Sequence, residues 1–227
     1  GGHRTYPLSQ SEKIFIPEFW CFSEYDKKTY QANNVNVEKF ETLGSLKASL
    51  SYEYCKIKNI KINPKKYDIC LISEARADRN MQDKIMSENA GMIAEYTHML
   101  CKKNNLKLIF TGENDANSKS GKQEIDFYKK YIKNENFKIS QAPRSEYPSY
   151  INILQSRLTL GLKSTLLREA IGLNEKILAC YWSGYPDDKF PIDDICLLTE
   201  ESYESFEKRV LKILSMDKSE YFKILGK

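Results

Sequence analysis

The chain has 227 residues, of which 41% are hydrophobic, and its 35 basic and 31 acidic residues give a formal net charge of +4. This apolar share is enough for a folded core and too high for a disordered chain. The mild charge permits contact with phosphates or an anionic membrane surface but does not indicate nucleic acid as a partner. No apolar run approaches the roughly 18 residues that a membrane span needs. We therefore expect a cytoplasmic protein, peripheral at most on the cytoplasmic face of the membrane.

The cysteine pattern indicates a reducing compartment. No pair of cysteines has the CxxC spacing, and the chain has only two histidines, His3 and His98, so the sequence predicts no zinc site. Half of the cysteines stand inside apolar runs, where cysteine behaves as a small buried hydrophobe. No disulfide is therefore expected among the six, which are Cys21, Cys55, Cys70, Cys101, Cys180 and Cys196.

Residues 1–66 are predicted to form a small N-terminal segment with short elements. The chain begins Gly1-Gly2-His3, which resembles a cleavage scar, so we expect the native chain to extend upstream. Pro17 favours the edge or the end of a strand. The expected elements are a strand at 14–20, helical turns at 26–31, extended pieces at 35–37 and 40–43, and an edge strand or linker at 56–62.

From residue 67 the pattern changes to an alternation of strands and helices. Short continuous apolar runs are typical of buried parallel strands, and apolar residues at helical spacing follow them. This order predicts an α/β fold, a Rossmann-like parallel sheet with helices on both faces, over residues 67–227. The expected strands are 68–72, 106–111, 136–140, 157–161, 177–181 and 195–198, and the expected helices are 82–104, 124–133, 150–155, 166–171, 201–214 and 219–225.

In such sheets ligands bind beyond the carboxyl ends of the strands. Ser73, Gly112 and Gly161 stand at three of these ends, and glycine lets a ligand approach the backbone closely. Gly112 opens a loop, 112–121, that we expect to fold over a ligand. Tyr147 and Tyr150 are expected to pack on a base.

The stretch from 155 to 181 is the most informative one. It predicts a strand, a helix that starts at Ser164-Thr165, and a second strand. A helix start carries unpaired N–H groups and a partial positive charge, so it can hold a phosphate, with Lys163 beside it. Glu169, one turn further on, can accept hydrogen bonds from a ribose. The alternative is that Ser164 or Thr165 merely caps the helix and that Glu169 is a solvated surface residue.

Familiar catalytic motifs are absent from the sequence. It contains no GxGxxG, no complete phosphate-binding loop and no GxSxG. His98 lies in the middle of a predicted helix and is expected to be structural. The acidic pairs 187–188 and 193–194 are more typical of solvated turns than of a cation site. We therefore predict no metal and no cofactor.

Three pieces carry a resemblance to a known family. The strand 68–72, the strand and glycine 106–112, and the stretch 160–172 together resemble the nucleotide-sugar-binding C-terminal half of a GT-B glycosyltransferase. The last piece is similar to the S-T-x-x-x-E-A pattern of bacterial transferases that build capsule and lipopolysaccharide. The resemblance implies that Ser164 and Thr165 contact phosphate and that Glu169 contacts the donor ribose. Residues 40–46 also resemble the crossover strand between the two GT-B halves.

The sequence also departs from that family. Retaining GT-B enzymes often carry a second glutamate eight residues before the ribose glutamate, and here that position is Gly161. Residues 1–66 are too few for an acceptor domain, so they are expected to be its remnant or its end, with a linker. The catalytic base is not assigned, and its candidates are Glu74, Asp78 and Glu113, at or just after strand ends.

Three functions stay open at this stage. The first is a glycosyltransferase, or its donor-binding half, with a nucleotide sugar as donor and a glycan or lipid-linked acceptor. The type of sugar, hexosyl or sialic/Kdo-type, and retention or inversion at the anomeric carbon are left open. The second is a sugar-nucleotide epimerase of the same architecture. The third is a non-catalytic nucleotide-binding partner domain.

Overall fold

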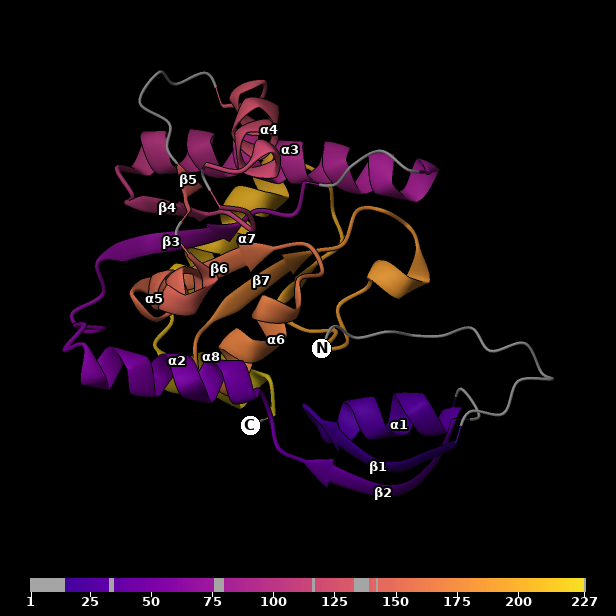
Figure 1. The fold of residues 1–227 in the computed structure, drawn as a ribbon. Helices are drawn as coiled ribbons and strands as arrows, with labels where there is room; N and C mark the ends of the chain where they lie inside the picture. The colour runs from indigo at the N-terminus through magenta and orange to yellow at the C-terminus, as the bar shows by residue number, and fades with distance from the viewer. Residues whose placement is uncertain are drawn as a thin grey trace. The chain divides into compact units, whose positions relative to one another are not determined.

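The computed structural model describes residues 15–32, 35–75, 80–115, 117–132, 139–141 and 143–226. The chain divides into two compact units, residues 1–50 and residues 51–227 (Figure 1). The boundary that the sequence predicts, after residue 66, lies further along, just before the first strand of the larger unit.

The first unit is a small β–α–β arrangement. Strand β1 (Phe15–Cys21) and strand β2 (Asn36–Thr42) pair in parallel, and α1 (Glu24–Ala32) connects them. The ring of Phe19 lies 4.4 Å from that of Tyr30 and 6.1 Å from that of Phe40, measured between centroids, so aromatic contacts join the helix to both strands. The two extended pieces expected at 35–37 and 40–43 are one continuous strand.

Helix α2 (Leu46–Ile57) follows, and it corrects one prediction. The alternation of lysine and isoleucine at 56–62 favours an edge strand or linker. Lys56 and Ile57 are instead the last helical residues, whereas residues 58–62 form no strand or helix, so the linker alternative holds for them. Asn59 has a positive φ of 53°, and the N–H of Ile60 donates to the carbonyl of Cys55 at 2.9 Å. This left-handed residue closes the helix and prevents an extended strand.

The larger unit is built on six parallel strands in the order β5-β4-β3-β6-β7-β8. The chain adds β4 and β5 on one side of β3 and then returns to add the other three on the opposite side. The order therefore reverses between β3 and β6, as in doubly wound dinucleotide-binding folds. The strands are β3 (Tyr67–Ile72), β4 (Leu108–Thr111), β5 (Ile139–Ser140), β6 (Ser156–Gly161), β7 (Ile177–Cys180) and β8 (Leu197–Leu198).

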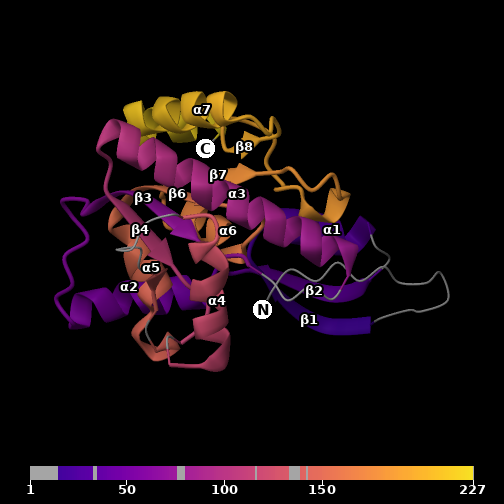
Figure 2. The same cartoon turned by 90° about the horizontal axis from the view of Figure 1, so that it is seen from above.

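Helices cover both faces of this sheet (Figures 1 and 2). Helices α3, α4 and α7 lie on one face, where α3 and α7 pack side by side, and α5 and α6 lie on the other. The predicted α/β fold with helices on both faces is thus confirmed. Bounds are α3 (Met81–Asn104), α4 (Lys119–Lys129), α5 (Pro148–Leu154), α6 (Thr165–Gly172), α7 (Tyr203–Ser215) and α8 (Lys218–Ile224), with short 3-10 turns η1 (Arg144–Glu146) and η2 (Pro186–Asp188).

The sequence predicts most of these bounds to within two residues, but α4 begins five residues before the expected start at 124. Ser118 caps it by accepting a hydrogen bond from the N–H of Gly121 at 2.9 Å. Polar residues around this cap read as loop in the sequence, although a serine cap is a helix-start signal. The predicted third strand, 136–140, is confirmed over its last two residues; residues 136–138 lie outside the described part of the chain.

The core lies on both faces of the central strands. Ile69, Leu71, Leu158, Leu160 and Leu178 are fully buried. All six cysteines are free and buried, including Cys70, Cys180 and Cys196, whose burial the sequence predicts. Burial raises the pKa of the Cys101 thiol and that of Cys196 to about 12, so these side chains are protonated packing groups.

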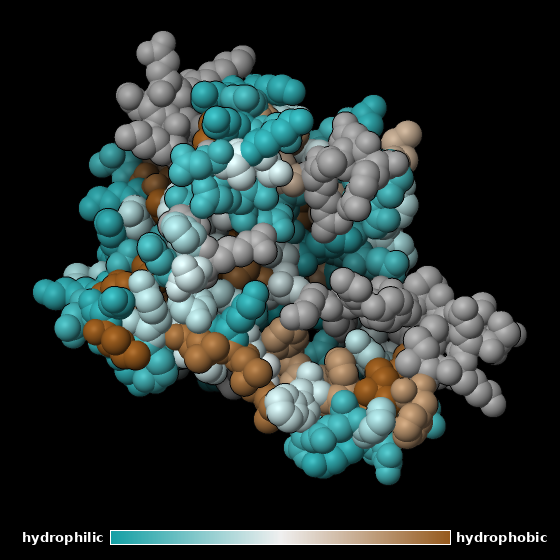
Figure 3. Space-filling view, viewed as in Figure 1, coloured by the Kyte–Doolittle hydropathy of each residue, from teal (hydrophilic) through white to brown (hydrophobic). Residues whose placement is uncertain are grey.

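Apolar side chains gather along α2 (Figure 3), where Leu46, Leu50 and Ile57 are exposed. In the part of the chain that the structure describes, no helix is both long and apolar enough to cross a membrane.

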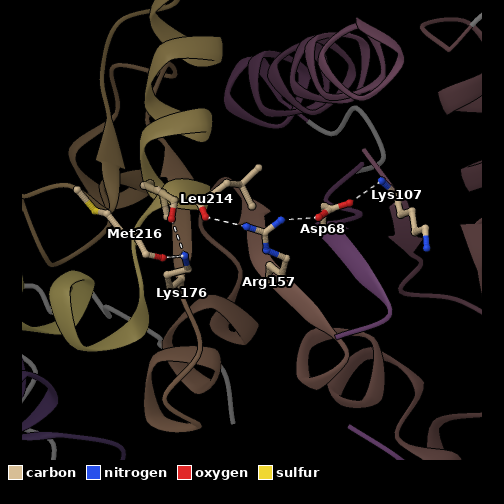
Figure 4. A network of polar contacts seen from close by, with 7 residues as sticks. Asp68, Lys107, Arg157, Lys176, Leu214 and Met216 are labelled. Carbon is tan, nitrogen blue, oxygen red and sulfur yellow. Dashed lines mark hydrogen bonds and ion pairs between the residues drawn. The ribbon is translucent and has the colours of Figure 1, made fainter. Parts of the chain in front are cut away.

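The amino-terminal edge of the sheet is held by a polar network (Figure 4). Arg157, at the start of β6, donates to the carboxylate of Asp68 at 2.8 Å and to the carbonyl of Leu214 at 2.9 Å. Lys176, just before β7, donates through Nζ to the carbonyls of Ile213 and Met216. Two cations thus satisfy carbonyls that the end of α7 leaves unpaired.

Candidate functional site

The carboxyl ends of β3 and β6 lie side by side at the point where the strand order reverses. Leu71 pairs in register with Leu160, so the residues that follow each strand meet at one edge. Ser73 and Glu74 leave β3 here, and Gly161 to Ser164 lead from β6 into α6. In sheets of this order, ligands bind in the crevice at this edge.

Glu74 joins the two strand ends. Its carboxylate accepts the N–H of Leu162 at one oxygen and the N–H of Lys163, at 3.0 Å, at the other. The residue is 8% exposed. Glu74 therefore fixes the backbone of the loop that precedes α6, which is a positioning role rather than the role of a solvent-facing base.

Gly161 is required by this arrangement. A Cβ at this position would lie 2.9 Å from the Oε2 atom of Glu74 and 3.3 Å from a methyl group of Leu167. The carboxylate of Glu74 therefore occupies the space into which any side chain at position 161 would project. The glycine is explained by this contact, and the predicted close approach of a ligand stays a prediction.

Tyr128, on α4, holds the end of β3 from the other side. Its buried hydroxyl oxygen accepts the N–H of Glu74 at 3.0 Å and the N–H of Ala75 at 3.1 Å, and Ser73 Oγ lies 3.4 Å away. Burial raises the pKa of this phenol, so the hydroxyl stays neutral. Ser73, a predicted donor-binding residue, is buried and directed at this hydroxyl.

The end of β4 is organised around a second buried carboxylate, Glu124. It accepts the N–H of Glu113 at 2.9 Å and the side-chain amide of Gln141 at 2.8 Å. At Gly112, a Cβ would lie 2.7 Å from Cγ of Gln141, so packing between strand ends accounts for this glycine. The side chain of Glu113 is exposed. Asp78, the remaining candidate base, lies outside the described residues.

The start of α6 has the geometry that the sequence predicts. Ser164 is the N-cap, and its hydroxyl oxygen accepts the N–H of Leu166 at 3.3 Å. Thr165 is the first helical residue, half-buried like Ser164. Ser164 therefore caps the helix, and its predicted contact with phosphate stays a prediction. A cap satisfies only part of the N–H groups at a helix start, so capping is compatible with phosphate binding.

Glu169 is buried rather than solvated, which rules out the surface alternative. It is 8% exposed, and its Oε2 atom accepts a hydrogen bond from the hydroxyl of Tyr150 at 3.0 Å. Tyr150 comes from α5, which packs against α6. Tyr150 is itself buried and holds Glu169 in place through this hydrogen bond. Of the two tyrosines expected to pack on a base, Tyr147 is half-exposed.

Lys163 has a partner that the sequence does not predict. Its ammonium group pairs with the carboxylate of Asp188, in η2 of the β7–β8 connection. Asp188 also accepts a hydrogen bond from Gln82, near the start of α3, at 3.0 Å. The sequence marks Asp188 only as part of an acidic turn. Asp188, Glu124 and Tyr128 were missed because their partners are distant in sequence.

The structure thus brings Glu74, Gly161, Lys163, Ser164 and Thr165 together around one loop and one helix start. Glu169 lies one turn further along the same helix. Gly112 and Glu113 belong to the neighbouring strand end. No group of three or more acidic, histidine or cysteine side chains with metal-binding geometry occurs within the described ranges. The arrangement offers backbone N–H groups, hydroxyls and one lysine, which are groups that bind phosphate.

Comparisons with known proteins give a family and a fold for this chain. A sequence model of the family described as "putative O-antigen biosynthesis protein" matches residues 42–185, well over half of the chain. No curated protein sequence matches. Among solved structures, the UDP-GlcNAc 2-epimerase of Neisseria meningitidis, bound to UDP-GlcNAc, is similar, with a TM-score of 0.53 and 15% identity.

The structural match covers 91% of this chain and 55% of the epimerase, so the chain spans about half the length of that protein. At this identity the likeness shows the fold alone. It confirms that the chain has a GT-B-like, Rossmann-like architecture.

Proposed function

The chain belongs to this O-antigen biosynthesis protein family, and from that premise we propose that it binds a nucleotide-activated sugar and transfers the sugar to a surface glycan acceptor. One observation carries the proposal: the start of α6 and the buried Glu169 lie on one helix, directly beyond the switch point of a doubly wound sheet. The fold of the epimerase, solved with UDP-GlcNAc, supports a sugar nucleotide as ligand.

Each group has a role in this proposal. The backbone N–H of Thr165 and the hydroxyls of Ser164 and Thr165 meet the donor phosphates, with Lys163 beside them. Glu169 accepts hydrogen bonds from the ribose. In the transfer, the bond between the anomeric carbon and the phosphate oxygen breaks, and the nucleotide leaves with the electron pair. The acceptor oxygen bonds to the anomeric carbon and gives its proton to a base. The helix start stabilises the departing phosphate.

The acceptor is proposed to be a glycan or a lipid-linked glycan at the cytoplasmic face of the inner membrane. Glu74 is a poor candidate for the base because both of its oxygens accept backbone N–H groups. A base supplied by acceptor-side residues is therefore the better expectation, since a proton acceptor must reach the acceptor hydroxyl directly.

The first test is binding. UDP-, GDP-, CDP-, CMP- and dTDP-linked sugars are titrated into the protein while thermal unfolding is followed, and ligand at about 100 times Kd adds roughly 2.7 kcal/mol to the free energy of unfolding. Glu169→Gln should weaken binding of the preferred nucleotide by about tenfold, the loss expected for ribose hydrogen bonds to a charged group. Glu204→Gln, on the exposed face of α7, is the control. A panel without any thermal shift would refute the proposal.

A sugar-nucleotide epimerase is the second candidate, favoured by the fold of the Neisseria enzyme. Turnover separates the two. A transferase consumes donor only when an acceptor is added, whereas an epimerase changes the sugar, or releases free nucleotide, without an acceptor. Binding without either reaction would favour a non-catalytic nucleotide-binding partner.

A further inference from the structure

Asp188 is a buried carboxylate of the β7–β8 connection that contacts two other segments of the larger unit. It is 3% exposed. One oxygen accepts from the ammonium group of Lys163, before α6, and from the amide of Gln82, in α3. The second oxygen, Oδ2, is buried and has no hydrogen-bond partner among the residues that the structure describes. A buried carboxylate with an unused acceptor is costly, so this arrangement needs a reason beyond packing.

Lys163 is the cation at the predicted phosphate position, and two carboxylates of the chain itself contact it. Its backbone N–H donates to Glu74 at 3.0 Å, and its ammonium group pairs with Asp188. The lysine side chain is 22% exposed, whereas that of Asp188 is 2% exposed. Part of the lysine side chain is therefore open to solvent, whereas the carboxylate that neutralises it is not.

We propose that Asp188 is a built-in competitor for phosphate at this site. It neutralises Lys163 in the ligand-free protein, and the phosphates of the sugar nucleotide must draw the lysine away from it. The inference rests on the proposed function, because the competing anion is the diphosphate of a sugar nucleotide. It adds that Asp188 lowers the affinity for phosphate and couples the β7–β8 connection to ligand binding.

The sign of the effect follows from Coulomb's law. A carboxylate close to the phosphate site repels a bound dianion and weakens the attraction of the lysine for it, most strongly where water is excluded. Asp188→Asn removes the negative charge but keeps the shape and an oxygen that can accept from Gln82. The substitution should therefore strengthen binding of phosphate-bearing ligands and leave binding of the bare nucleoside unchanged.

Asp187→Asn is the matched control. Asp187 is the neighbouring residue in the same 3-10 turn, carries the same charge and is exposed. The two substitutions change the net charge of the protein equally. Only the buried one acts on Lys163, since solvent and salt screen the exposed one.

The experiment measures Kd by calorimetry for UDP and for uridine, or for the nucleotide and nucleoside that the panel prefers. Asp188→Asn should tighten nucleotide binding by about tenfold, and Asp187→Asn should change it by less than about twofold. Lys163→Met should weaken nucleotide binding. Asp188→Asn added to Lys163→Met should then have a smaller effect than in the wild type, because only the direct repulsion between the carboxylate and the phosphate is left to remove. The gain should shrink as salt is raised.

Unchanged or weaker nucleotide binding in Asp188→Asn, with the wild type binding normally, would overturn the inference and leave the proposed function standing. If no variant and no wild-type sample binds any nucleotide, both fall together. Should Asp188→Asn fail to fold, a crystal structure of the wild type with bound nucleotide decides. Lys163 Nζ on a phosphate oxygen supports the inference, and Nζ still on Asp188 alone overturns it.

Discussion

The two edges of the six-stranded sheet use opposite charges at opposite ends of helices. At the amino-terminal edge, Arg157 and Lys176 donate to carbonyls at the end of α7 (Figure 4). At the carboxyl-terminal edge, the carboxylate of Glu74 accepts two backbone N–H groups just before α6, and the carboxylate of Asp188 forms an ion pair with Lys163. In both places the side-chain charge complements the partial charge of the helix end.

The difference lies in what else can bind. At the amino-terminal edge, the cations Arg157 and Lys176 donate to carbonyls. Carbonyls do not bind anions, so we expect these contacts to stabilise the fold without binding a ligand. At the second edge protein carboxylates lie beside a helix start, which favours anions, and we propose that a phosphate from solvent replaces or joins them. The comparison predicts that substitutions at the first edge change stability alone, whereas those at the second change stability and ligand binding together.

The largest expected effect is that of Glu74→Ala. The substitution leaves the N–H groups of Leu162 and Lys163 without their acceptor in a buried place, and each such group costs about 1–3 kcal/mol. We expect a loss of about 3 kcal/mol in the free energy of unfolding, together with weaker nucleotide binding, because the loop before α6 is no longer fixed. Urea unfolding and calorimetry measure the two effects.

A second substitution makes this test specific. Gly161→Ala alone should be destabilising, since its Cβ would lie 2.9 Å from Glu74 Oε2. In the Glu74→Ala background that clash is gone, so Gly161→Ala should cost much less there. Additive losses in the double variant would show that the carboxylate does not occupy the space beside residue 161.

The next effect concerns Lys176 at the opposite edge. Burial lowers its pKa from 10.5 to about 8, so the folded chain binds this proton less tightly than the unfolded chain does. The stability that the group contributes is therefore fully present above pH 10.5 and is lost as the pH falls through about 8. The neutral amine can still donate two hydrogen bonds, which is the number of carbonyls that it meets.

Lys176→Met removes this titration. The difference in unfolding free energy between wild type and variant should grow in favour of the wild type from pH 8 upward, with a slope of at most about 1.4 kcal/mol per pH unit. Other titrating groups cancel in the difference. Nucleotide affinity should be the same in both proteins. A pH-independent difference would show that the lysine is not desolvated as the structure indicates.

The sequence predicts the sheet better than it predicts the contacts at either edge. Strands β3 and β7 contain continuous apolar runs, and β6 alternates polar residues with leucine. Ser164 is a residue type that favours the cap position, so the local pattern is sufficient for these elements. Glu74 reaches a loop 88 residues away, and Lys163 pairs with a residue 25 positions further on. Such pairs depend on strand order, which local pattern does not encode.

Glu169 shows the same limit within the predicted site. Its place one turn into α6 follows from spacing, but its burial depends on the hydroxyl of Tyr150 on α5. The sequence offers Tyr150 as a platform for a base, and the structure instead makes it the support of the carboxylate. The sequence therefore predicts the order of elements along the chain, but not the order of the strands within the sheet or the direction of the side chains.

The smallest expected effect separates burial from charge. Lys189 and Asp193 form an ion pair at 2.6 Å in the same β7–β8 connection that carries Asp188. Both side chains are exposed, and solvent screens such pairs almost completely. Asp193→Asn should therefore leave the melting temperature and nucleotide affinity unchanged within the scatter of the measurement.

Asp188→Asn makes the same change of charge five residues earlier, and we expect it to alter nucleotide affinity. If the two substitutions acted alike, net charge rather than the buried position of Asp188 would govern the phosphate site, and the contrast between the two edges would lose its basis.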